Sequence, residues 1–114
     1  MRKISLGIFG TLLCALLGVV TSVTMVLAAD AKAGEAVYQK ACKSCHGADG
    51  TANPSLVKML KVDIKDLKSP EVQSMSAAEI TKVVTEGKGK MRPVTSVTGS
   101  AADDVAAYVK TMKK

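Results

Sequence analysis

Two of the chain's three cysteines and its one histidine lie within five consecutive residues, Cys42-Lys43-Ser44-Cys45-His46. This C-x-x-C-H spacing is typical of covalent haem attachment, in which each cysteine sulfur bonds one vinyl group of the porphyrin. The histidine that follows can then offer a ring nitrogen to the iron. The motif predicts one haem c per chain, bound through Cys42 and Cys45, with His46 as an axial ligand of the iron.

Three other uses of this motif remain open. A structural zinc site usually needs four protein ligands, so carboxylates would have to complete a set of two cysteines and one histidine. A redox-active C-x-x-C pair is expected near a βαβ pattern, and the sequence shows none. A disulfide between Cys42 and Cys45 would close a very short loop and would stabilise the fold little. Haem attachment, which the spacing of the motif itself predicts, is the interpretation that we favour.

The N-terminal segment has the pattern of an export signal. Arg2 and Lys3 are followed by an uncharged stretch from Ile4 to Ala29, which ends in small residues. A basic start, an apolar middle and a small-residue end predict a signal peptide over residues 1–28, cut after Ala28 or Ala29. If it is retained, the same stretch is long enough for a membrane anchor, which needs about 20 residues.

The export pattern also fixes what we expect of the remaining chain. Cys14 lies inside the apolar stretch after Leu13, where a lipoprotein signal would need a small residue, so we interpret it as part of the leader. We expect a cytochrome domain over residues 29–114 and a periplasmic location, because haem c is attached outside the cytoplasm. Contact with a membrane is expected only if residues 1–28 are retained.

The predicted domain is too small and too poor in aromatic residues for a large core. Residues 29–114 number 86, and their only aromatic side chains are those of Tyr38 and Tyr108. Chains of this size bury a small share of their surface and usually need a disulfide, a metal or a cofactor to be stable. Without Arg2 and Lys3 the formal net charge falls from +6 to +4. One remaining arginine, two aromatic rings and no binding motif argue against a nucleic-acid partner.

Periodicity predicts three main helices, over residues 31–43, 77–86 and 101–112. Asp30 is the expected N-cap of the first helix. Ser76 and Glu79 form a capping box for the second, and Gly87 ends it. Residues 54–70 are ambiguous, and we expect a short helix over 55–60 followed by irregular chain. Since no convincing strand alternation appears, the predicted fold class is all-α.

Four methionines after residue 29 are candidates for the second axial ligand, a common role of methionine opposite histidine. Met112 continues the apolar face of the last helix, and Met59 and Met75 have plausible packing roles beside a helix and before a cap. Met91 differs because it follows Gly87-Lys88-Gly89-Lys90 on a loop. We therefore predict His46 and Met91 as the iron ligands, with Met75 and Met59 as the alternatives.

Together these motifs resemble a class I cytochrome c of the small bacterial type. The matching segments are Cys42-Lys43-Ser44-Cys45-His46-Gly47, Met75-Ser76-Ala77-Ala78-Glu79-Ile80, Gly87-Lys88-Gly89-Lys90-Met91 and Asp103-Asp104-Val105-Ala106-Ala107-Tyr108-Val109. The resemblance implies three main helices and loops around one haem, with the first and last helices crossing near Gly34 and Tyr108. It also implies that the Pro54 carbonyl accepts a hydrogen bond from His46. One departure is Arg92, which separates Met91 from Pro93, where many relatives have proline directly.

The expected function is one-electron transfer without catalysis, because two filled axial positions leave no open site on the iron. Four lysines flank the ligand segments and would steer the protein to redox partners with acidic surfaces: Lys40, Lys43, Lys88 and Lys90. We expect a monomer. A haem enzyme or gas sensor in which Met91 does not bind iron is a second hypothesis. A third is a subunit or tethered module of a larger redox complex.

Overall fold

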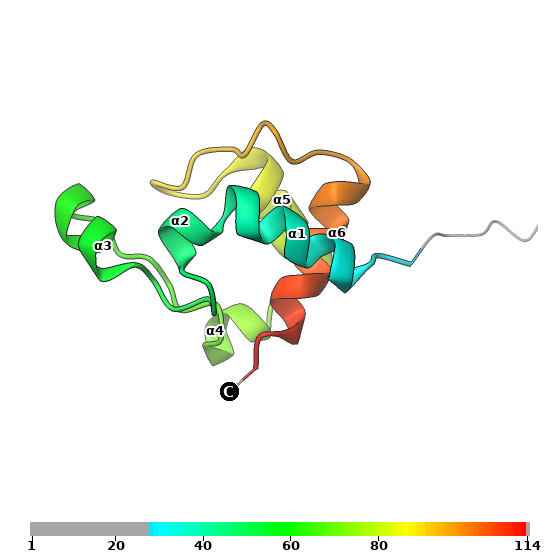
Figure 1. Ribbon diagram of the computed structural model, residues 1–114, viewed down its shortest axis with the longest axis horizontal. Coiled ribbons are helices and arrows are strands. Elements are labelled where there is room, and N and C mark those ends of the chain that lie inside the picture. Colours follow the sequence, from blue (N-terminus) through cyan, green and yellow to red (C-terminus); the bar gives the residue numbers. More distant parts are fainter. Residues whose placement is uncertain (1–27, 114) are drawn as a thin grey trace, which may run out of the picture.

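The computed structural model describes residues 28–113, in which six helices and an isolated bridge between Lys88 and Met91 are found and no strand occurs (Figure 1). The predicted all-α class is confirmed. The leader predicted over residues 1–28 lies outside the described residues except for Ala28. The helices are α1 Ala31–Ala41, α2 Lys43–His46, α3 Pro54–Leu60, α4 Pro70–Gln73, α5 Ala77–Glu86 and α6 Ser100–Thr111.

Local capping explains where the main helices begin. The Asp30 carboxylate accepts hydrogen bonds from the backbone N–H groups of Lys32 and Ala33, at 2.9 and 3.2 Å. Ser76 and Glu79 form both bonds of the predicted capping box, and Gly87 ends α5. Helix α6 begins at Ser100, one residue before the predicted start; Gly99 is its N-cap residue, and no side chain caps it. The α4 turn was also not predicted; Ser69 caps it and Pro70 begins it.

The core forms where α1 crosses α6 (Figure 1). Gly34 lies so close to α6 that an added Cβ would come within 1.9 Å of the Asp104 carbonyl oxygen. Tyr38 is fully buried, and its ring meets that of Tyr108 edge to face at 5.3 Å between centroids. The expected crossing at Gly34 is therefore confirmed. The other buried core side chains are Cys42, Val72, Ile80, Val84, Val97, Ala102, Val105, Ala106, Val109 and Met112.

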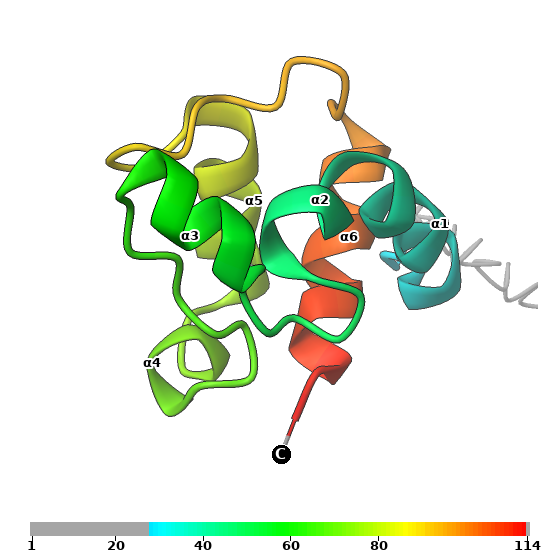
Figure 2. The ribbon, with the colours of Figure 1, turned by 60° about the vertical axis from the view of Figure 1, so that its left-hand side comes forward.

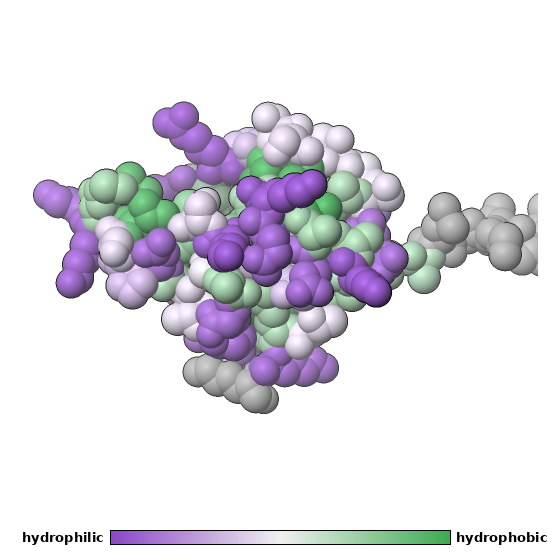
Figure 3. All heavy atoms as spheres, viewed as in Figure 1, coloured by the Kyte–Doolittle hydropathy of each residue, from purple (hydrophilic) through white to green (hydrophobic). Residues whose placement is uncertain are grey.

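Helix α3 lies at the edge of the fold, away from the crossing of α1 and α6 (Figures 1 and 2). Its Met59 and Leu60 are the two large apolar residues that the described part of the chain leaves exposed, at 69% and 52%. Figure 3 shows this apolar surface with hydrophilic side chains around it. Lys90 contacts the Lys61 carbonyl at 3.5 Å, which brings α3 beside the loop that carries Met91.

No helix within residues 28–113 is long and apolar enough to cross a membrane.

Candidate haem site

One helical turn carries both cysteines and the histidine of the motif. The backbone N–H groups of Cys45 and His46 both donate to the Cys42 carbonyl, at 3.2 and 3.0 Å. Residues three and four apart lie on one side of a helix, so the two thiols and the imidazole are neighbours. Cys42 is buried, while Cys45 and His46 are half-buried. The turn thus gathers two sulfur nucleophiles and one nitrogen ligand along one side.

Burial shifts the pKa of two groups in this turn, and the shift of His46 suits ligation. Burial lowers the pKa of His46, so the ring is neutral and its nitrogen lone pair is free at neutral pH. Burial also raises the pKa of the Cys42 thiol. Both cysteines are free thiols, so the alternative of a Cys42–Cys45 disulfide is not seen. Within the described range, no group of three or more His, Cys, Asp or Glu side chains is arranged to hold a metal ion.

One nitrogen of the His46 imidazole lacks a hydrogen-bond partner within the described residues. Its Nδ1 is buried and has no hydrogen-bond partner among residues 28–113. An unpaired buried nitrogen costs about 1–3 kcal/mol, which proteins usually avoid. The bond expected from His46 to the Pro54 carbonyl is not formed here; Pro54 is the exposed first residue of α3, so its role stays a prediction. A half-buried imidazole beside two thiols, with its Nδ1 buried and unpaired, fits a site that is completed when a further group binds.

Two residues that the sequence did not single out hold this turn in place. The Tyr38 hydroxyl donates to the carbonyl of Gly47, directly after His46, at 2.7 Å. On the other side, the Asn53 N–H donates to the Cys45 carbonyl at 3.0 Å. Gly47 has φ +74°, and an added Cβ would lie 2.1 Å from the Thr51 carbonyl oxygen. One signal for Tyr38 was present in the sequence, since it is one helical turn before Cys42 and one of two aromatic residues.

Met91 lies on a tightly folded loop. Lys88 and Met91 exchange two backbone hydrogen bonds of 3.0 Å, which close a turn over Gly89 and Lys90. Gly87 permits this path, because an added Cβ there would lie 2.6 Å from the Met91 carbonyl oxygen. The Val94 N–H then donates to the Val84 carbonyl at 2.8 Å and ties the loop to α5. Met91 is half-buried on this loop, and its role as an iron ligand stays a prediction.

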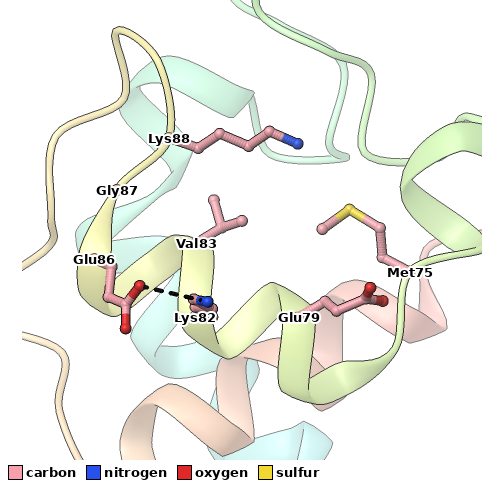
Figure 4. Close-up of a pocket in the computed structure, with 7 residues that line it drawn as sticks. All are labelled: Met75, Glu79, Lys82, Val83, Glu86, Gly87 and Lys88. Carbon is pink, nitrogen blue, oxygen red and sulfur yellow. Dashed lines mark ion pairs between the residues drawn. The ribbon is translucent and has the colours of Figure 1, made fainter.

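The other three methionines occupy different surroundings. Met112 is buried in the core, as expected. Met59 is exposed on α3, so the packing role considered for it is not seen. Met75 lines a recess of about 330 Å³, and Figure 4 shows its thioether and the Lys88 side chain extending into this space above Val83. The full lining is Met75, Glu79, Lys82, Val83, Glu86, Gly87 and Lys88.

Comparison with known proteins identifies the class. No curated protein matches the chain. The chain is similar to a solved structure described as KustC0563 c-type cytochrome, with 26% identity and a TM-score of 0.59, over 71% of this chain and 98% of that chain. Residues 29–109 match the family described as cytochrome c oxidase, cbb3-type, subunit III. The resemblance to small c-type cytochromes, which carry covalent haem c and transfer electrons, is confirmed. The chain therefore belongs to the cbb3-type cytochrome c oxidase subunit III family of c-type cytochromes.

Proposed function

We propose that this domain is a one-haem electron carrier that works outside the cytoplasm, with His46 and Met91 as axial ligands. The observation that carries the proposal is the single turn that presents Cys42, Cys45 and a half-buried His46, whose Nδ1 is buried and unpaired. Cys42 and Cys45 would hold the group through thioether bonds, each formed by adding a thiol across one vinyl group. Once bound, the haem supplies an iron that exchanges one electron between its ferric and ferrous states.

The chain's own residues then tune and protect the site. A neutral His46 binds iron through one nitrogen, and the buried Nδ1 is the atom that the Pro54 carbonyl would accept a hydrogen bond from. Met91 supplies a thioether, which favours the reduced iron. If His46 and Met91 both bound the iron, no ligand position would be left for a substrate, and the domain would act as a carrier and not as an enzyme.

The lysines predicted to steer partners are accessible. Lys40, Lys43, Lys88 and Lys90 are all exposed, on α1, α2 and the Met91 loop. Exposed charges of one sign attract oppositely charged partners over a distance set by the salt concentration. This supports docking of a monomeric carrier to acidic surfaces of redox proteins. Replacing Lys88 and Lys90 by Gln should slow electron exchange with anionic hexacyanoferrate and weaken its salt dependence, whereas Lys32→Gln should not.

A role inside a terminal oxidase is the second candidate. The matched family is described as an oxidase subunit, which favours an oxidase as the electron acceptor. Membranes that contain a cbb3-type oxidase should then oxidise the reduced protein and consume oxygen, and membranes without that oxidase should not. Intact-mass analysis of the exported protein would show whether residues 1–28 are removed or remain as an anchor.

The decisive experiment is optical. Purified exported protein should show sharp reduced bands, a haem c product in pyridine, and the weak long-wavelength ferric band of an iron–methionine bond. Met91→Ala should remove that ferric band, while Met59→Ala and Met75→Ala should keep it. Loss of the band in Met75→Ala alone would show that the ligand assignment is wrong. A high-spin ferric spectrum in the wild type would favour the enzyme or sensor hypothesis, and a protein without haem would refute the proposal.

A further inference from the structure

Helix α2 is too short to hold its own shape. It has four residues and thus one turn, whereas isolated helices shorter than about 12 residues are marginal in water. Its N-cap, Cys42, makes no side-chain capping bond. The position of the His46 backbone must therefore be set by contacts from outside the turn.

One of these contacts comes from Tyr38, one of the two largest fully buried side chains of the described residues. Tyr38, on α1, has no exposed surface, and its ring packs against the Tyr108 ring of α6. Its hydroxyl reaches past the core to donate to the Gly47 carbonyl at 2.7 Å. A phenylalanine would fill the same core volume, so packing alone does not explain the hydroxyl. The hydrogen bond is the feature that tyrosine adds.

The backbone directly after His46 is restricted, so it could adjust little if the bond from Tyr38 to Gly47 were lost. Gly47 has a positive φ, and the Thr51 carbonyl blocks the space that any side chain would need. The Asn53 N–H holds the Cys45 carbonyl from the opposite side, and the Asn53 amide group donates to the Ser44 carbonyl at 3.3 Å. The turn is therefore held by a buried phenol on α1 and by Asn53, the N-cap residue of α3.

We propose that the Tyr38 hydroxyl is a positioning group for the axial ligand: through the Gly47 carbonyl it fixes the turn that carries His46 to the crossing of α1 and α6. This inference rests on the proposed function, because it takes His46 as the iron ligand. The positioning role belongs to the Tyr38 hydroxyl, which the packing of the ring in the core does not require. Loosening the bond should free the ligand turn locally and change the environment of the iron.

The test compares two variants that each lose one oxygen atom. Tyr38→Phe removes the bond to Gly47. Tyr108→Phe is the matched control, because within residues 28–113 its hydroxyl has no hydrogen bond while its ring makes the same edge-to-face contact. Both proteins would be studied as holoproteins by amide hydrogen exchange and by redox titration. The amides of Cys45, His46 and Gly47 are the reporters, since they donate to carbonyls within the turn.

In Tyr38→Phe, these three amides should exchange about tenfold faster, as expected for the loss of one hydrogen bond, while amides of α5 and α6 should not change. The reduction potential should also move in Tyr38→Phe and stay at the wild-type value in Tyr108→Phe. Equal exchange and equal potential in the two variants would overturn the inference, as would uniformly faster exchange in all helices. A wild-type protein without haem c would instead refute the proposed function, and the pyridine spectrum separates that failure from this one.

Discussion

Replacing Gly34 with alanine tests the close approach of the first and last helices. The added Cβ would lie 1.9 Å from the carbonyl oxygen and 2.4 Å from the carbonyl carbon of Asp104. Both are backbone atoms inside α6, so no side-chain rotation relieves the overlap. The two helices would have to move apart, and Val105 and Ala106, both almost fully buried at this contact, would lose packing.

Two opposing effects set the size of the change. Alanine is favoured over glycine in a helix by about 1 kcal/mol. Overpacking costs about 1–3 kcal/mol, occasionally more, and a rigid backbone neighbour places this site at the upper end, about 3 kcal/mol. The net loss is thus about 2 kcal/mol, a large share of the roughly 4–13 kcal/mol expected for a domain of this size. For such a domain it corresponds to a fall in Tm of about 8–16 °C.

Thermal unfolding followed by circular dichroism would measure this loss on the haem-containing protein. Gly89→Ala is the control, because an added Cβ there meets no atom within 4 Å although its φ is +58°. The control carries only the backbone strain of a left-handed alanine, about 1–2 kcal/mol. If Gly34→Ala were as stable as the wild type or more so, helix propensity would have outweighed the contact. The close crossing described here would then be wrong.

Other regions of the fold give further predictions. Ser76→Ala should lower the free energy of unfolding by about 1 kcal/mol, measured in urea, because it removes the cap of α5. The hydrogen bond from the Thr51 N–H, and to a smaller extent the one from Lys68, lowers the pKa of the Asp49 carboxyl from 3.8 to about 2. The ionised carboxylate therefore stabilises the fold fully above pH 3.8, and this contribution is lost as the pH falls toward 2. Melting curves of the wild type and Asp49→Ala should therefore converge across that range; a constant gap would contradict the assignment. Joint replacement of Cys42 and Cys45 by Ala should leave a protein without haem and with little helical signal, and normal helicity would refute the view that the cofactor completes the core.

The main helices could be predicted because their signals are local. Asp30 as a cap, and Ser76 with Glu79 as a capping box, act within three residues and give the helix starts that the structure shows. The first helix was predicted to run through residue 43 without interruption, but α1 ends at Ala41 and Cys42 separates it from α2. The α4 turn was missed because four residues are too few to show periodicity.

The long-range contacts of the site could not be read from sequence patterns alone. The motif located Cys42, Cys45 and His46, but nothing in the spacing shows that a tyrosine hydroxyl reaches Gly47 or that Asn53 holds the Cys45 carbonyl. Likewise, the glycines before Met91 indicated a loop, but not the two hydrogen bonds between Lys88 and Met91 that close it into a turn. Such pairings depend on how distant segments meet, and single-sequence reasoning finds them only through a resemblance.

The pairing of α1 with α6 also sets the order in which this protein can assemble. The Asp30 N–H donates to the Asp104 carboxylate across 74 positions of sequence, next to the Gly34 contact. Closing so long a loop is entropically costly and slows folding. Along the chain, Cys42 and Cys45 precede by more than 50 residues the helix that completes the core, α6 Ser100–Thr111. We expect the thiols to meet their cofactor on an open chain, with the final helix closing the structure behind it.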